Sequence, residues 1–102
     1  MSKRYLLART ISARPLSTAQ LEVAVTTSVR RLFGAFGLAR IYPKVLRFDS
    51  ANALAIISCN GEGAEDLQAA IALISDAAEA KVAVVTIRVS GTIKGLRTKQ
   101  HF

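Results

Sequence analysis

Alternating runs of apolar and polar residues predict a small α+β fold. Short apolar runs bounded by turn residues predict four β-strands, at residues 4–12, 41–49, 52–60 and 82–90. Two segments with apolar residues at helical spacing predict helices, one beginning after Ser17 and one at 64–80. The element order is therefore β-α-β-β-α-β.

The first helix has clear sequence signals at both ends. Ser17 and Gln20 are spaced as a capping box. Gly34 and Gly37 are expected to end the helix through a left-handed cap. The expected apolar stripe consists of Leu21, Val25, Val29, Leu32, Phe33 and Phe36.

The middle strands and the second helix are also patterned. Residues 49–52 are turn formers, so the strands on either side are expected to form an antiparallel hairpin. Pro43 lacks an N–H group, which favours a sheet edge for the first of these strands. The expected inner face of the second helix consists of Leu67, Ile71, Ile74 and Ala78.

This order predicts a ferredoxin-like, RRM-like sandwich, with an antiparallel sheet and two helices on one face. Residues 1–90 are expected to form one α+β domain, and residues 91–102 a basic C-terminal tail. RNA-recognition domains stack bases on aromatic side chains of their central strands. The matching stretch, 54–59, contains no aromatic residue, so base stacking of that kind is not expected.

The strands are apolar on both faces, although helices are expected to cover only one. In the last strand Ala83, Val85, Ile87 and Val89 are assigned to one face, and Val82 and Val84 to the other. An open face this apolar is usually covered. Either the chain's own tail, or a protein partner or second copy, is expected to cover it.

The uneven distribution of charge along the chain indicates a class of partner. The 102-residue chain has 14 Lys and Arg against 7 Asp and Glu, a formal net charge of +7. Five of the acids fall within residues 62–81, whereas residues 82–102 contain four bases and no acid. A two-sided basic domain indicates a polyanionic or acidic partner, with a basic surface that only aids solubility as the alternative.

Candidate catalytic and metal-binding residues are scarce, and none is predicted. Cys59 is the only cysteine, which excludes an internal disulfide, and it is expected to be a small buried strand residue. His101 is the only histidine and lies next to the C-terminus, so a Cys59–His101 pair is disfavoured. An acylphosphatase-type hydrolase would need a glycine-containing phosphate loop after the first strand, and residues 11–15 contain no glycine. No apolar run approaches a membrane span, and a cytoplasmic protein is expected.

The best candidate site follows the last strand, where hydroxyl residues and glycines alternate with cations. Hydroxyl groups and backbone N–H groups around Gly91 are suited to donate to phosphate oxygens, while the cations add charge. The candidate residues are Ser90, Gly91, Thr92, Lys94, Arg97 and Lys99. An ordinary solvated basic tail is the alternative. Arg4, Arg30 and Arg31 are further candidate RNA contacts from composition alone.

In the order and spacing of several short segments, the chain resembles the Pop-five family of ribonuclease P proteins, also called protein component two. The resemblance covers nearly the whole chain. It is carried by residues 4–7, 32–39, Phe48-Asp49, Ile57-Ser58-Cys59 and 90–94. The family often has a basic residue where this chain has Ser58. The long acidic extension of eukaryotic members is absent, so the chain looks archaeal.

The resemblance implies a non-catalytic subunit of an RNA-based endoribonuclease. In this family the ribonuclease P RNA removes the 5′ leader of precursor tRNA using Mg²⁺, and the protein itself holds no cofactor. The implied protein partner is the TIM-barrel subunit, and two such pairs can join as a heterotetramer. The alternative function is a protein-interaction or homodimeric ferredoxin-like domain whose basic charge is incidental.

Overall fold

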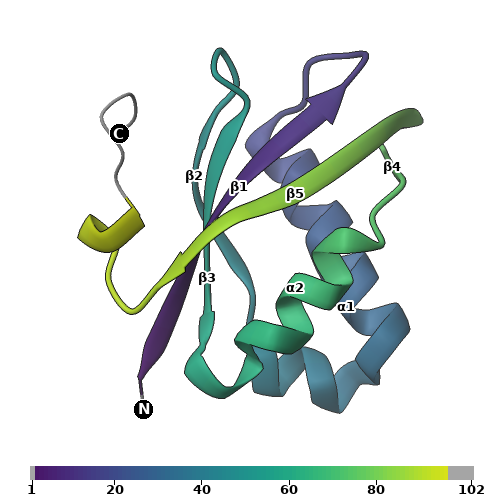
Figure 1. The fold of residues 1–102 in the computed structure, drawn as a ribbon. Helices are drawn as coiled ribbons and strands as arrows, with labels where there is room; N and C mark the ends of the chain where they lie inside the picture. Colours follow the sequence, from purple (N-terminus) through teal and green to yellow (C-terminus); the bar gives the residue numbers. More distant parts are fainter. Residues whose placement is uncertain (1, 97–102) are drawn as a thin grey trace.

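The computed structural model describes residues 2–96 and has the predicted α+β sandwich (Figure 1). Its sheet has the strand order β2-β3-β1-β5-β4, and all pairings are antiparallel. The strands are β1 (Lys3–Ser12), β2 (Lys44–Asp49), β3 (Leu54–Asn60), β4 (Asp76–Ala77) and β5 (Ala80–Ser90). The helices α1 (Thr18–Ile41) and α2 (Ala64–Ala72) both cover one face of the sheet. The ferredoxin-like prediction is confirmed, and β2 lies at a sheet edge as Pro43 indicated.

Helix α1 begins as predicted but ends later. Ser17 and Gln20 form the capping box, with the Gln20 N–H donating to Ser17 Oγ at 3.0 Å. Gly34 interrupts the helix, as expected, but the expectation that Gly37 ends it is wrong. Gly34 has a non-helical backbone with φ 72°, yet helical residues resume after it and continue to Ile41. Tyr42 supplies the left-handed cap, so β2 begins at Lys44 instead of residue 41.

The break at Gly34 also corrects the predicted apolar stripe. Leu21, Val25 and Val29 are buried, and Phe33 packs against the core. Leu32 is 43% exposed and Phe36 is 94% exposed. A non-helical residue changes the rotational phase of the residues that follow it, and so Phe36 points away from the core although its spacing fits the stripe.

The second helix is half as long as predicted. It ends at Ala72, and the residues expected to continue it form β4 and a tight hairpin into β5. Ala78 and Glu79 take positive φ values of 52° and 63° in this turn. Ala78 is therefore exposed in a turn and does not lie on a helix face. Leu67, Ile71 and Ile74 are buried as expected.

Strand register separates the two faces of the sheet. The face toward the helices carries the main core, including Leu6, Ala55, Ile57 and Val84. A register shift between Leu7 and Ala8 places Val89 opposite Leu6 on this same face. The expectation that Ala83, Val85, Ile87 and Val89 share one face is therefore wrong, because a bulge inverts the alternation.

The opposite face, which we call the open face, carries a second, smaller core. It consists of Leu7, Leu54, Ile56 and Leu96, all at most 3% exposed, with Tyr5 packed against them. Leu96 comes from a 3₁₀ turn (Lys94–Leu96) that lies on the side of the sheet away from the helices (Figure 1). Of the two covers that the sequence left open, the chain's own C-terminal segment covers the centre of this face.

Replacing Leu96 by alanine is expected to lower the free energy of unfolding by about 2–4 kcal/mol, because the change removes buried methyl groups and opens a cavity. Urea denaturation of the full chain measures this loss. Leu73→Ala, at a leucine that is 63% exposed, is the matched control and should cost less than about 0.5 kcal/mol. Equal midpoints for the two variants would show that Leu96 does not pack on the sheet.

Candidate nucleic-acid interface

The segment after β5 is held by local side-chain hydrogen bonds. The Thr92 N–H donates to Ser90 Oγ at 3.2 Å, and the Gly95 N–H donates to Thr92 Oγ1 at 3.0 Å. The Leu96 N–H donates to the Ile93 carbonyl at 3.0 Å. These bonds fold the residues between Ser90 and Leu96 into two successive turns. The candidate segment therefore has a defined backbone path up to Leu96.

Leu96 fixes this folded segment to the sheet. Its side chain packs among the open-face residues Leu7, Leu54 and Ile56. Arg88, in the adjoining strand, adds a hydrogen bond from Nη1 to the Gly95 carbonyl at 3.5 Å. The hydroxyl residues and Lys94 are therefore presented from a fixed position beside the sheet.

The two glycines of the segment have different roles. A Cβ on Gly95 would collide with Ser90 Oγ, so this close approach requires glycine. A Cβ on Gly91 would have room, since the nearest atom outside the adjacent residues is Arg4 Nη1 at 3.8 Å. The same distance shows that the Arg4 guanidinium lies next to Gly91. The structure thus brings Arg4, predicted from composition alone, to the candidate segment.

The predicted site residues fall into three groups. Ser90, Gly91, Thr92, Lys94 and Arg4 lie together at one end of the sheet. Arg30 and Arg31 are exposed on α1, on the helix side, and are not near them. Arg97 and Lys99 lie outside the described residues.

One detail of the predicted phosphate contact is corrected. The Thr92 N–H is already bonded to Ser90 Oγ, so it is not available to a phosphate. In these turns the Ser90 and Thr92 hydroxyl oxygens act as acceptors. A hydroxyl that accepts one bond keeps its own hydrogen for another partner. The hydroxyl groups, the cations and the Gly91 N–H therefore stay the predicted donors to phosphate.

Several cations that the sequence analysis did not single out share the open face. By register, Lys44 lies across from Ser58, Arg47 from Ile56, and Arg9 from Leu54. Arg88 lies across from Leu7 on the other side of β1. Strand alternation could have identified Arg9, but bulges in β2 and β5 shift the alternation at Arg47 and Arg88.

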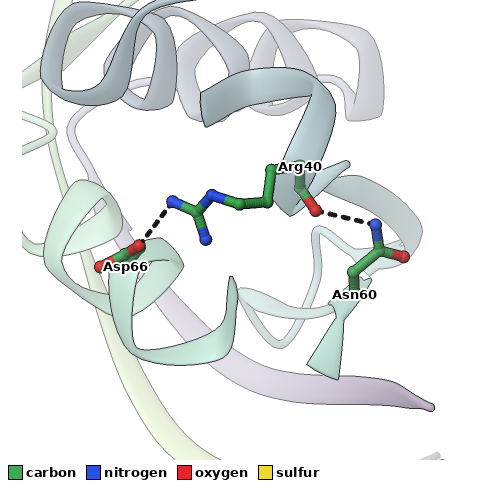
Figure 2. Close-up of polar contacts among 3 residues, drawn as sticks. All are labelled: Arg40, Asn60 and Asp66. Carbon is green, nitrogen blue, oxygen red and sulfur yellow. Dashed lines mark hydrogen bonds and ion pairs between the residues drawn. The ribbon is translucent and has the colours of Figure 1, made fainter. Parts of the chain in front are cut away.

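Arg40 is engaged within the protein (Figure 2). Its Nη2 is 2.8 Å from Asp66 Oδ2, and its carbonyl accepts a 2.8 Å hydrogen bond from Asn60 Nδ2. The ion pair is about 40% exposed, so it adds little to stability. These contacts join the end of α1 to α2 and β3.

Cys59 has the environment of a structural residue. It is completely buried on the helix side of β3. Burial raises the pKa of the Cys59 thiol, against the smaller lowering by the charges of Lys3 and Arg4. A thiol held neutral is a poor nucleophile. Within residues 2–96, no three His, Cys, Asp or Glu side chains gather as metal ligands. No helix in that range is long and apolar enough to cross a membrane.

The helix side of the molecule has a different surface. An open groove of about 450 Å³ lies between α1 and residues 73–78. Its lining includes the exposed apolar side chains of Val23, Leu32 and Leu73, with Arg31 and Asp76 among the polar ones. This mixed surface is unlike the cationic open face.

Comparisons with known proteins agree with this architecture. A chain in the cryo-EM structure of yeast ribonuclease MRP superposes with a TM-score of 0.76 over 97% of this chain and 81% of that chain. The two are 16% identical, so the similarity establishes the shared fold.

The sequence comparisons identify the family as well as the fold. Ribonuclease P protein component 2 of Pyrococcus furiosus is 30% identical over 95% of this chain and 81% of its own length. The protein of the same name from Thermococcus kodakarensis is 30% identical over 94% of this chain and 80% of its own. The family model described as Rpp14/Pop5 matches residues 4–100. The chain therefore belongs to the Rpp14/Pop5 family and is a ribonuclease P protein subunit.

Proposed function

We propose that this chain is a non-catalytic subunit that binds the catalytic RNA of ribonuclease P and supports removal of the 5′ leader from precursor tRNA. The observation that carries the proposal is the segment Ser90–Leu96. It holds two hydroxyl groups, Lys94 and the nearby Arg4 in a fixed arrangement at one end of the sheet. Membership in the Rpp14/Pop5 family supports RNA as the ligand.

The proposed contacts are with phosphates and sugars. Cations and hydroxyl groups position a protein on folded RNA without reading its bases. Ser90 and Thr92 donate their hydroxyl hydrogens, Lys94 and Arg4 supply charge, and Arg97 and Lys99 extend the contact along the chain. Arg30 and Arg31 remain predicted contacts of a separate surface on the helix side.

Hydrolysis is assigned to the RNA subunit, which holds the Mg²⁺ ions in this proposal. This chain then contacts precursor tRNA only indirectly, through the assembled enzyme. We propose the cytoplasm as the place of action.

The proposed protein partner is the TIM-barrel subunit of the same enzyme, and two such pairs can form a heterotetramer. The exposed apolar side chains of Val23, Leu32 and Leu73 around the helix-side groove support a protein contact there. The same surface supports the second candidate function, a protein-interaction or homodimeric domain with incidental charge. Light scattering separates the two, because a stable dimer that is indifferent to RNA would favour the second.

Adding the chain and its TIM-barrel partner to the RNA subunit is expected to stimulate precursor tRNA cleavage at limiting Mg²⁺, since added cations offset repulsion between RNA phosphates. Initial cleavage rates with and without each protein measure the effect. The RNA subunit alone and the partner alone are the controls. No stimulation by the pair would contradict the proposal.

Replacing Lys94, Arg97 and Lys99 together by alanine is expected to flatten the log–log salt dependence of RNA binding by about 2–3 units, because fewer counterions are released. Filter binding at several salt concentrations measures the slope. Arg14→Ala with Lys81→Ala is the control, because the pairing of Ser12 with Val82 puts these two cations at the other end of the sheet. An unchanged slope in the triple variant would show that the tail is not part of the RNA interface.

Gly95→Ala is expected to weaken RNA binding about 5–10-fold, because the added methyl group displaces the Ser90 hydroxyl and opens both turns. Gly91→Ala has space for its methyl group and should bind within about twofold of wild type. The urea midpoints of both variants test whether the sheet stays folded. Equal RNA affinities would show that the turn geometry does not matter for binding.

A further inference from the structure

The cations of the open face are arranged around the small core that Leu96 completes. One cross-strand row runs Arg47, Ile56, Leu7 and Arg88, so two arginines flank two buried apolar side chains. The next row places Arg9 beside Leu54, and the row on the other side begins with Lys44. Adjacent strands are about 4.8 Å apart, so the two arginines of the first row start about 14 Å from each other.

The centre of this face offers no surface for a nucleobase. Leu96 covers Leu7, Leu54 and Ile56. Tyr5, the aromatic residue that register places on this face, is partly buried against the same cluster. Phe48 packs toward the helix side. Among residues 2–96 the well-exposed aromatic rings are those of Phe36 in α1 and Tyr42 in its cap, and Lys3 Nζ lies over the Tyr42 ring, 5.2 Å from its centroid.

Negative charge on this face is confined to its edges. Register places two acids there, Asp49 at the corner in β2 and Asp76 in β4, opposite Lys81. The two carboxylate oxygens of Asp49 accept bonds from the Asn52 backbone and side-chain nitrogens, at 3.2 and 2.7 Å. Glu65 and Asp66 lie on α2, on the opposite side of the sheet. The open face therefore combines several cations with a neutral, sealed centre.

We infer that the open face binds the phosphate backbones of a double-stranded RNA stem, with Arg47 and Arg88 contacting phosphates on opposite sides of the Leu96 cover. This inference rests on the proposed RNA-binding function and specifies the form of RNA that the sheet binds. Arg9 and Lys44 contribute to the same surface. The segment Ser90–Lys94 then adjoins the stem at one end of the sheet.

A stem fits this face better than an unpaired strand. Single-stranded RNA is usually held by bases stacked on aromatic rings, in addition to its charged backbone. Double-stranded RNA presents stacked, paired bases internally and is recognised mainly through phosphates and 2′-hydroxyl groups across its wide minor groove. Cations on either side of a covered centre match the second pattern.

The test uses an RNA hairpin with a stem of about 16 base pairs, comparable to the length that other double-strand-binding domains span. Arg47→Gln with Arg88→Gln is expected to flatten the salt dependence of binding to this hairpin by about 1.4–1.8 units. Arg14→Gln with Lys81→Gln removes the same charge at the far end of the sheet and should change the slope by less than about half a unit.

Because Arg88 also bonds to the Gly95 carbonyl, a second variant leaves that contact in place. Arg9→Gln with Lys44→Gln should also flatten the slope, by a similar amount. If neither open-face variant differs from the control pair, the inference is wrong. If an unpaired RNA of equal length binds more tightly than the hairpin and shows the same sensitivity to these variants, the ligand is single-stranded and the inference is also wrong.

These outcomes are distinguishable from failure of the proposed function. Wild-type chain and its TIM-barrel partner should still stimulate the ribonuclease P RNA even if the hairpin result is negative. Loss of that stimulation in the wild type contradicts the function itself, whereas an unaffected slope in the open-face variants contradicts only the stem-binding surface.

Discussion

The packing of Leu96 on the open face is the contact on which the arrangement of the interface depends. A ferredoxin-like sheet with two helices on one side leaves its other side uncovered, and here that side contains Leu7, Leu54 and Ile56. Leu96 removes these residues from water and at the same time anchors the turn that contains Ser90, Thr92 and Lys94. One hydrophobic contact therefore stabilises the sheet and orders the polar groups beside it.

The same contact determines which kind of RNA recognition this fold can perform. In RNA-recognition domains the open face stacks bases on exposed aromatic rings. Here its centre is aliphatic and covered, and its arginines and Lys44 lie around that centre. The proposed contact of this fold is therefore with the RNA backbone and not with the bases. The acids Glu65 and Asp66 lie on α2, on the other side of the sheet.

Much of the fold could be predicted from local sequence signals. The strand and helix order, the Ser17 capping box and the edge position of β2 all follow from residue patterns that act over a few positions. The errors arose where long-range contacts decide the backbone. The alanine-rich stretch after Ala72 has no strong helix stop, and the hairpin there places Ala78 and Glu79 at positive φ without a glycine. The β5 bulge, which inverts the facing of Val89, has no local signature either.

The candidate site was partly predictable for the same reason. Alternating hydroxyl residues, glycines and cations marked Ser90 to Lys94 in the sequence. The proximity of Arg4 and the row of Arg47 with Arg88 depend on strand order and register, which bring together residues distant in the chain.

The most direct measurement of the central claim maps which side of the protein faces the RNA. A chelated iron is attached to a new thiol in two variants, Lys94→Cys beside the open face and Glu65→Cys on α2. The buried Cys59, whose raised pKa makes it slow to label, is replaced by alanine in both. Hydroxyl radicals released from position 94 should cut the bound ribonuclease P RNA at a defined stem, and those from position 65 should not cut that stem. Cutting from position 65 with none from position 94 would contradict the account.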